Sequence, residues 1–362
     1  MSHCEADTAA DMIADGSAAA LERSSAHMAE LVASELTVIV ENAFWIYEIQ
    51  DPGRPGVRQI GLGCMAATEQ IRTAETPDGT IIRNEGIREK KAAGRARLIE
   101  ATQAYIGVVN NTFEDAGGRV SAALETIADQ RPPDFETTDE KGYIHRNWME
   151  TSPTRIEELT RLMSGIPCAY VADGNHRSAA AAHLGREAFL NVLFPTDRMG
   201  LAPYNRLVSS LADYAVQEFV DALAADFEVT RSTEAPRVAH HVAGLYLGRE
   251  YGWVTLRPKA HTYDVENAVQ VIDSDIIQRC VFDKLLGIAD ARDERLNFVG
   301  GDRPVSYLVD RVDNGNFAFA VSLAPVSMKQ IIDICEQDRF MPPKSTWFEP
   351  KIRIGLVIGL FE

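Results

Sequence analysis

The sequence of 362 residues has few basic residues, few cysteines and no long apolar run. It contains 36 Lys and Arg against 53 Asp and Glu, so the formal net charge is −17. Binding to nucleic acid depends on many Lys and Arg side chains that displace counterions from phosphates. The acidic balance therefore argues against a general nucleic-acid binder, although it leaves room for one local basic pocket that takes a small anion.

The scarcity of cysteine and of apolar runs excludes two further classes. The five cysteines are scattered and no two have metal-ligand spacing, which argues against a cysteine-based zinc site and is typical of reduced thiols. The most apolar stretch, 36–49, is interrupted by Glu41 and Glu48, and a membrane span needs roughly 18 apolar residues. The acidic N-terminus lacks the order of a signal peptide. We therefore expect a cytoplasmic protein with no membrane partner.

What is present is an ordinary globular composition, with 46% hydrophobic and 25% charged residues. The length suits one large α/β unit or two domains. Strand-like runs are expected at 43–50, 58–66, 104–110, 143–148, 168–172, 189–194, 242–256, 307–312, 317–323 and 352–360. Helices are expected within 1–35 and at 84–100, 120–129, 154–164, 178–184, 213–226 and 276–286. The alternation predicts an α/β or mixed α+β fold.

The segment that carries most chemistry is YVADGNHRSAAAA, residues 170–182. An apolar strand ends at Ala172 and a helix begins a few residues later. Gly174 allows a sharp turn, and the free N–H groups that open the helix favour an anion. Arg177 can grip a phosphate through two parallel hydrogen bonds, and Asp173 can hold Mg²⁺ or accept a proton. The simpler alternative is that Asp173 caps the helix and Arg177 forms a surface ion pair.

Two other clusters also allow either a structural or a ligand-binding interpretation. The stretch 83–97 holds six of the 36 cations and also Glu85, and it is either a solvated helix face or a set of charges that faces the Asp173 turn. The segment MPPKSTWFEPK, residues 341–351, is either a structural loop or a rigid loop that presents Lys344, Ser345 and Thr346 to a ligand. The patch that contains Arg206 is similarly a loop with a stacked tyrosine or a ligand contact.

The histidines outside these clusters are less informative. His240, His241 and His261 lie in a hairpin region without nearby sequence partners, and we interpret them as surface residues rather than ligands.

The chain resembles domain-of-unknown-function family 1015 (DUF1015) from about residue 43 to its end. The motifs that carry the resemblance are RNE at 83–85 with Lys91 and Arg95, IHRNW at 144–148, the turn at 170–177, PYNR at 203–206, LNFVGG at 296–301 and MPPKSTWFEPKIRIGL at 341–356. The family's Asp-Gly-x-His-Arg element looks like that of the ParB/sulfiredoxin-like fold, where it binds nucleotide phosphates. Some members with a similar element are free L-serine kinases.

The resemblance implies a function and a set of site residues. It implies a small-molecule kinase that transfers phosphate from ADP or ATP to the hydroxyl of a free amino acid such as L-serine, with Mg²⁺. Glu85, Asp173 and His176 would be catalytic, and Asp173 would be the metal ligand. The nucleotide would be held by Gly174, Asn175, His176, Arg177, Arg206, Lys344, Ser345 and Thr346. The alternatives are a nucleotide-binding regulatory protein without turnover and, against the charge, a ParB-like DNA binder.

The resemblance also implies a division of the chain and shows departures. We expect a variable helical segment 1–42, a ParB/sulfiredoxin-like module 43–210, a second α/β segment 211–335, and a C-terminal loop and strand 336–362 that packs back on the fold. The family usually has His where this chain has Asn84 and Asn175, and its usual N-terminal Pro-Pro-Tyr-Asp element is not visible here. The sequence leaves open the acceptor, the choice between ADP and ATP, and whether the chain forms a homodimer.

Overall fold

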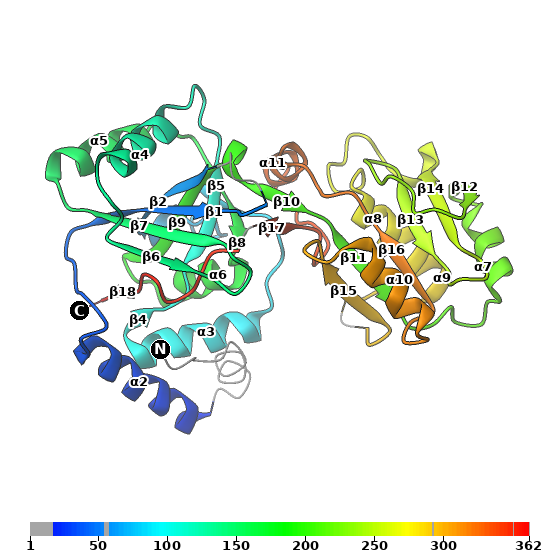
Figure 1. Ribbon diagram of the computed structural model, residues 1–362, viewed down its shortest axis with the longest axis horizontal. Helices are drawn as coiled ribbons and strands as arrows, with labels where there is room; N and C mark the ends of the chain where they lie inside the picture. The colour runs from blue at the N-terminus through cyan, green and yellow to red at the C-terminus, as the bar shows by residue number, and fades with distance from the viewer. Residues whose placement is uncertain (1–16, 54–57, 292, 350, 362) are drawn as a thin grey trace. The chain divides into compact units, whose positions relative to one another are not determined.

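The computed structural model describes residues 17–53, 58–291, 293–349 and 351–361 (Figure 1). The chain forms two compact units. Unit 1 comprises Met1–Arg83, Ile87–Met199 and Pro350–Glu362, and unit 2 comprises Asn84–Gly86 and Gly200–Glu349. Each unit combines a sheet with helices, so the expected mixed α/β class is confirmed. Any helix within residues 1–16 lies outside the described part of the chain.

Unit 1 is built on a mixed eight-stranded sheet with the order β3-β8-β5-β9-β2-β1-β7-β6. Its strands are β1 Phe44–Gln50, β2 Arg58–Ala67, β3 Ile81–Arg83, β5 Val109–Phe113, β6 Phe135–Thr138, β7 Ile144–Glu150, β8 Ala169–Asp173 and β9 Ala188–Pro195. β1 and β2, expected as strands at 43–50 and 58–66, form an antiparallel hairpin, whereas β3 pairs with β8 and β5 with β9 in parallel. Parallel neighbours are buried on both faces, which explains the unbroken apolar runs of β8 and β9.

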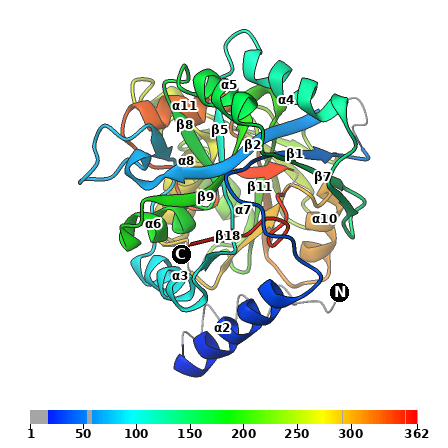
Figure 2. The same cartoon turned by 90° about the vertical axis from the view of Figure 1, so that its left-hand side faces the viewer.

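Helices cover both faces of this sheet (Figure 2). They are α2 Ala18–Ala33, α3 Glu89–Thr102, α4 Arg119–Gln130, α5 Pro153–Met163 and α6 Asn175–Leu184. In both views α4 and α5 lie on one side of the sheet, and α3 and α6 lie on the other. The core between them contains the fully buried side chains of Phe113, Phe189 and Phe194. Burial of such rings stabilises the layer by roughly 1.5–3 kcal/mol each.

Unit 2 has an antiparallel six-stranded sheet with the order β12-β14-β13-β16-β11-β15. Its strands are β11 Tyr204–Val208, β12 Phe227–Ser232, β13 Ala243–Tyr246, β14 Trp253–Pro258, β15 Leu296–Gly300 and β16 Phe319–Ser322. Its helices are α7 Val216–Leu223, α8 Asp273–Ile277, the π-helix Gln278–Asp283, α9 Lys284–Leu286, α10 Val305–Asp313 and α11 Met328–Glu336. Separately, β10 Gly200–Ala202 pairs with β17 Trp347–Glu349.

Two of the expected strands are not formed as predicted. Residues 307–312 form the helix α10 rather than a strand, because Leu308 and Val312 are four residues apart and both turn into the core. The C-terminal stretch 352–360 is mostly irregular, and only β18 Gly359–Leu360 pairs, with β4 Ala104–Tyr105.

The helix expected at 154–164 is α5, which begins and ends one residue earlier. Its N-cap is Ser152 without a side-chain bond, and Pro153 occupies the first turn. The boundary predicted after residue 210 falls within unit 2, since β11 pairs with β15 and β16. Among the described residues, no helix is both long enough and apolar enough to cross a membrane.

Candidate functional site

The turn between β8 and α6 has the strand-to-helix geometry that the sequence predicts. β8 is buried from Ala169 to Ala172, and Asp173 is its last residue. Gly174 then adopts φ +108°, and α6 begins at Asn175. The backbone N–H groups of Arg177 and Ser178 both donate to the Gly174 carbonyl at 2.8 Å. The helix therefore starts directly beside the Asp173 carboxylate.

Gly174 is required at this turn for two physical reasons. A φ of +108° is a conformation that side-chain-bearing residues rarely adopt. In addition, a Cβ at this position would lie 3.0 Å from Arg177 Nε. The glycine thus allows the Arg177 side chain to fold back across the turn.

Arg177 connects the turn to a neighbouring strand. Its Nη2 lies 3.4 Å from Asp173 Oδ2, and its Nη1 donates a hydrogen bond to the Val108 carbonyl. The side chain is mostly buried, with 13% of its surface exposed. Arg177 is therefore a fixed wall of the site rather than the surface ion pair of the simpler interpretation.

Asp173 has a second cationic neighbour. Lys351 Nζ lies 3.8 Å from Asp173 Oδ2, and both side chains are about 40% exposed. Lys351 is the last residue of the MPPKSTWFEPK segment, which the sequence analysis singled out without assigning Lys351 a role. Two cations thus accompany one accessible carboxylate.

Arg95 brings a further cation to the same place from α3, which packs on α6. Burial lowers the pKa of Arg95, the nearby positive charge of Arg177 lowers it further, and Asp173 opposes both effects. Arg95 Nε is buried and has no hydrogen-bond partner among the described residues. Two like charges and an unused buried donor favour a bound anion at this point.

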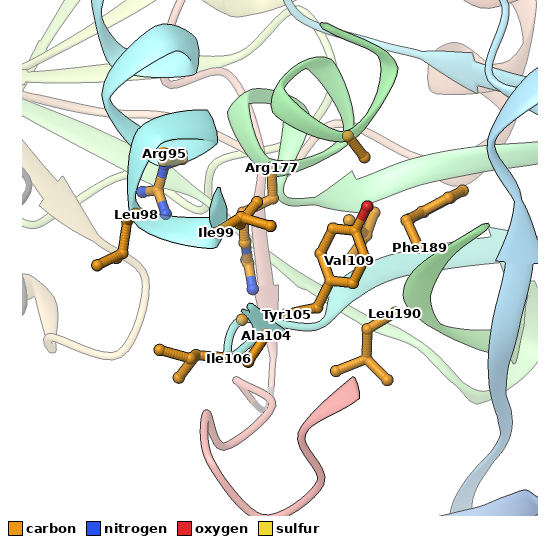
Figure 3. A pocket seen from close by; sticks show the side chains of 12 residues that line it. Arg95, Leu98, Ile99, Ala104, Tyr105, Ile106, Val109, Arg177, Phe189 and Leu190 are labelled. Atoms are coloured by element: carbon orange, nitrogen blue, oxygen red, sulfur yellow. The ribbon is translucent and has the colours of Figure 1, made fainter. Parts of the chain in front are cut away.

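Both arginines line a pocket of about 430 Å³, counted with its open mouth (Figure 3). Its other walls are mainly apolar and come from α3, the segment 104–109, α6 and β9: Leu98, Ile99, Ala104, Tyr105, Ile106, Gly107, Val109, Ala181, Phe189 and Leu190. In Figure 3 the two guanidinium groups lie across the pocket from Phe189 and Leu190. A pocket with one cationic and one apolar end suits a ligand that is anionic at one end and flat or apolar at the other.

The imidazole ring of His176 is held in place by a hydrogen bond. Its Nε2 accepts a hydrogen bond from the backbone N–H of Arg88 at 3.0 Å. Arg88 is the N-cap of α3 and makes no side-chain cap bond of its own. His176 therefore satisfies one of the orphan donors of α3 and ties α3 to the start of α6. Its catalytic role stays a prediction.

The remaining predicted site residues belong to unit 2. Arg206 is 3% exposed and donates to the carbonyls of Tyr204 and Lys344. Ser345 is buried, donates to the Pro342 carbonyl at 2.7 Å and accepts from Ser274 at 2.9 Å.

Lys344 is exposed, and its Nζ lies 3.4 Å from the Tyr204 hydroxyl. Thr346 is half-buried, and Glu85 forms an isolated bridge with Met341. Ligand roles for these unit 2 residues, and the pairing of Glu85 with Asp173, stay predictions.

Arg95 belongs to a motif of the family resemblance and to the basic stretch 83–97, but it was not among the predicted site residues. Of that stretch, Arg88, Lys90, Lys91 and Arg97 are exposed, as the solvated-face interpretation expects. Arg95 lies between Gly94 and Ala96, which are both buried on α3. Small residues let another element pack closely against a helix, and this pattern was the signal that the sequence offered.

Comparison with known proteins gives one family match. The family model described as "Protein of unknown function (DUF1015)" matches residues 5–275. No curated protein matches the chain.

Among solved structures, a free serine kinase in complex with AMP is similar at a TM-score of 0.40 and 11% identity, over 76% of this chain and 89% of that one. SbnI with a C-terminal truncation, from Staphylococcus aureus, gives 0.42 and 10% over 82% and 87%. A conserved hypothetical protein from Pyrococcus furiosus gives 0.39 and 11% over 76% and 90%.

Proposed function

Because the chain belongs to the DUF1015 family, and because the sequence resemblance extends to its Asp-Gly-x-His-Arg element, we propose that it is a small-molecule kinase. It transfers phosphate from ADP or ATP to the hydroxyl of a free amino acid such as L-serine, and unit 1 is its ParB/sulfiredoxin-like nucleotide module. One observation carries the proposal: Arg95 and Arg177 line one pocket beside the Asp173 carboxylate, where α6 begins.

The cationic end of the pocket is suited to the nucleotide phosphates. Arg177 is held in place by Val108 and Asp173, so it is pre-organised for an anion. Arg95 Nε is a buried donor without a partner, which a phosphate oxygen would satisfy. The N–H groups of Asn175 and His176 open α6, and we propose them as further donors to the phosphates.

The apolar end of the pocket is suited to the base and sugar. Leu98 and Ile99 of α3 are partly exposed and supply the apolar surface, whereas Phe189 and Tyr105 lie buried behind them in the core. Apolar walls with a few fixed polar groups are the usual environment of a nucleotide.

Asp173 is the proposed base for the acceptor. The serine hydroxyl oxygen forms the new bond to phosphorus while the bond to the leaving ADP or AMP breaks, and Asp173 takes the hydroxyl proton. Lys351, at 3.8 Å, is placed to stabilise charge on the acceptor or the transferred group. Glu85 in unit 2 is proposed, on the family resemblance, as the second acidic group that binds the amino group or Mg²⁺.

The residues present fit Mg²⁺ that arrives with the nucleotide. Mg²⁺ usually takes one or two carboxylates and fills its shell with phosphates and water. Asp173 offers one accessible carboxylate, and within the described residues it belongs to no cluster of three His, Cys, Asp or Glu side chains. When bound there, the ion would neutralise phosphate charge.

The test is direct detection of phosphoserine by mass spectrometry after incubation with ADP or ATP, Mg²⁺ and serine, threonine or homoserine. Product is expected with one acceptor, and Asp173→Asn and Glu85→Gln should each lower its rate by at least about 10²-fold. Asp197→Asn, which removes an exposed carboxylate of unit 1, is the matched control and should keep the rate. Nucleotide binding without any product would favour the regulatory alternative. Full activity in both variants would exclude the assigned roles.

A further inference from the structure

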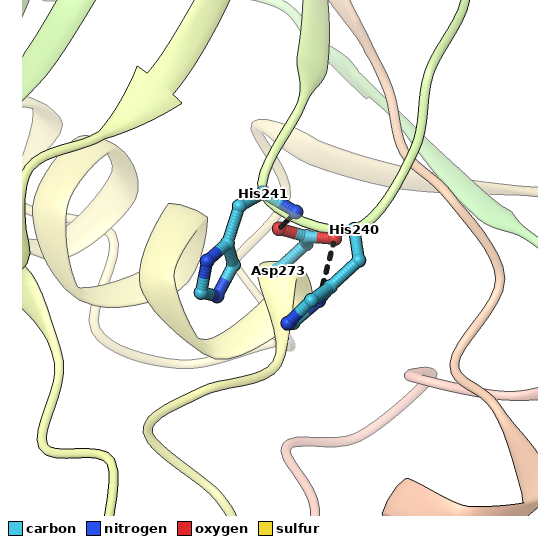
Figure 4. Close-up of side chains that lie close together, drawn as sticks. All are labelled: His240, His241 and Asp273. Atoms are coloured by element: carbon cyan, nitrogen blue, oxygen red, sulfur yellow. Dashed lines mark hydrogen bonds and ion pairs between the residues drawn. The ribbon is translucent and has the colours of Figure 1, made fainter.

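A cluster of metal-ligating side chains lies in unit 2, and none of its members is a predicted site residue. His240, His241 and Asp273 each offer one ligand atom, and these atoms lie within 4.8 Å of one another. Figure 4 shows both imidazole rings on the same side of the backbone, with the Asp273 carboxylate next to the turn that carries them. No other such group of three is found among the described residues.

The backbone holds the two histidines in this arrangement. Ala239 and Val242 exchange backbone hydrogen bonds of 3.2 and 2.8 Å, so His240 and His241 are the two central residues of a tight turn. His241 adopts φ +59°, an uncommon conformation for a residue with a side chain. Its N–H donates to Asp273 Oδ1 at 2.9 Å, which fixes the carboxylate against the turn.

The hydrogen bonds of His241 determine which ring atom can bind a metal. Its Nε2 lies 2.9 Å from the Val271 carbonyl, and a carbonyl can only accept. Nε2 therefore carries the proton, and the lone pair of the neutral ring is on Nδ1. This is the arrangement of a metal-binding histidine, whose other N–H donates to a carbonyl that fixes the ring.

His240 completes the cluster from the solvent side. Its Nδ1 lies 3.8 Å from Asp273 Oδ2, and its ring centroid is 3.8 Å from that of His241. The side chain is 55% exposed, so the ring can rotate to bring a nitrogen onto an ion held by the other two groups. The description of His240 as a surface residue is thus correct, but the sequence did not show Asp273 beside it.

We propose that His240, His241 and Asp273 bind a divalent transition-metal ion, Zn²⁺ in the first place, with water completing its shell. Two imidazoles and one carboxylate prefer Zn²⁺ and its transition-metal neighbours to Mg²⁺ or Ca²⁺, which require oxygen ligands. A three-ligand set with an open position also matches the usual Zn²⁺ coordination by two histidines and a carboxylate.

A bound ion would cross-link two segments of unit 2. It joins the turn 239–242, which precedes β13, to Asp273, the first residue of α8. These two segments are more than 30 positions apart in the chain. An ion that binds only the folded protein raises its melting temperature in proportion to the logarithm of the free metal concentration above Kd.

The experiment uses the full chain after treatment with a chelator. Calorimetric titration with Zn²⁺ should show one equivalent bound, a thermal scan should show a rising Tm, and Mg²⁺ at the same concentration should do neither. Co²⁺ should give visible absorption bands that Zn²⁺ removes. His240→Gln, His241→Asn and Asp273→Asn should each weaken Zn²⁺ binding at least about tenfold. At position 241, Asn can adopt the positive φ of the native residue. At position 273, Asn keeps a side-chain oxygen that accepts the His241 N–H.

The matched control is His261→Gln, which removes a 61% exposed histidine that pairs with a carboxylate, Asp226, in the same unit. It should leave Zn²⁺ affinity unchanged. Absence of saturable Zn²⁺ binding, or equal binding in all three variants, would overturn the proposal. If the variants fail to fold, modification of the wild-type histidines by diethyl pyrocarbonate is the alternative test. Zn²⁺ should protect His240 and His241 from modification but not His261. Equal modification of all three histidines in the presence of Zn²⁺ would refute the site.

Discussion

Arginines in the two units show how differently one residue type can be used. Arg206 in unit 2 is almost fully buried, donates to two backbone carbonyls and lies 5.0 Å from the centre of the Phe298 ring. Arg95 in unit 1 is half-buried at a pocket, faces the charge of Arg177, and keeps a buried Nε without a partner among the described residues. Burial lowers the pKa of both, that of Arg206 to about 10.

The difference separates structural from ligand-binding cations. A buried charge is tolerated when surrounding dipoles satisfy it, and Arg206 meets that condition inside its own unit. Arg95 does not, since the charge of Arg177 opposes it and its Nε has no hydrogen-bond partner among the described residues. A buried donor of this kind supports ligand binding where it also belongs to a residue that lines a pocket, as Arg95 does.

The largest effect on stability is expected at Arg206. Arg206→Met removes the buried donor that bonds the carbonyls of Tyr204 and Lys344, which should cost about 2–4 kcal/mol. Hydrogen exchange measured by mass spectrometry should become faster in β11 and β16 and stay unchanged in β5. Unchanged protection in β11 would show that Arg206 does not hold unit 2 together.

Substitution of Arg95 should affect ligand binding much more than stability. Arg95→Met removes a like-charge repulsion, so the free energy of unfolding should change by less than about 0.5 kcal/mol. Affinity for ADP, measured by calorimetry, should fall about 10- to 100-fold, because one charge-assisted hydrogen bond is lost. Arg97→Met removes an exposed cation from the same helix and should bind ADP normally. Equal affinity in both variants would contradict the phosphate-binding role of Arg95.

The turn at Gly174 gives an intermediate effect. Gly174→Ala combines a strained φ with a Cβ 3.0 Å from Arg177 Nε, and it should cost about 1–3 kcal/mol and displace the Arg177 side chain. Gly185→Ala has φ +62° but open space around its Cβ, so its cost should be near 1 kcal/mol. Urea unfolding and ADP affinity measure both variants. If ADP binding weakens equally in the two, the Arg177 contact is not what the glycine preserves.

The smallest effect concerns acid stability. At Asp139 in unit 1, burial tends to raise the pKa, but the N–H groups of Tyr143 and Lys141, with His145 and Arg353, bring it below its ordinary value of 3.8. A lowered folded-state pKa stabilises the protein above about pH 4, and this contribution is lost as the pH falls through the folded pKa.

Thermal melting of the wild type between pH 5 and pH 3 should therefore depend more steeply on pH than that of Asp139→Asn. Asp197→Asn, which removes an exposed carboxylate, should follow the wild-type curve. Identical slopes for wild type and Asp139→Asn would show that this carboxylate does not contribute.

The sequence alone determined the features that depend on neighbouring residues. An apolar run before Asp173, a glycine and an alanine-rich stretch suffice to predict β8, the turn and α6, because these elements are set by local propensity and backbone conformation. The hairpin of β13 and β14 is predictable for the same reason. The segment 307–312 is not, since an apolar run of six residues is compatible with either a strand or a helix until its packing partners are known.

Only the tertiary structure decided which side chains meet. Arg95 reaches the Asp173 turn because α3 packs on α6, and the 78 positions between Arg95 and Asp173 leave no local pattern that could show it. His241 and Asp273 meet for a similar reason, through a turn and a helix start from separate parts of unit 2. The net charge of −17 argues against a general nucleic-acid partner, and this stays a prediction. Which of the few cations is left unsatisfied, and so is available to an anion, depends on burial, which is a property of the folded chain.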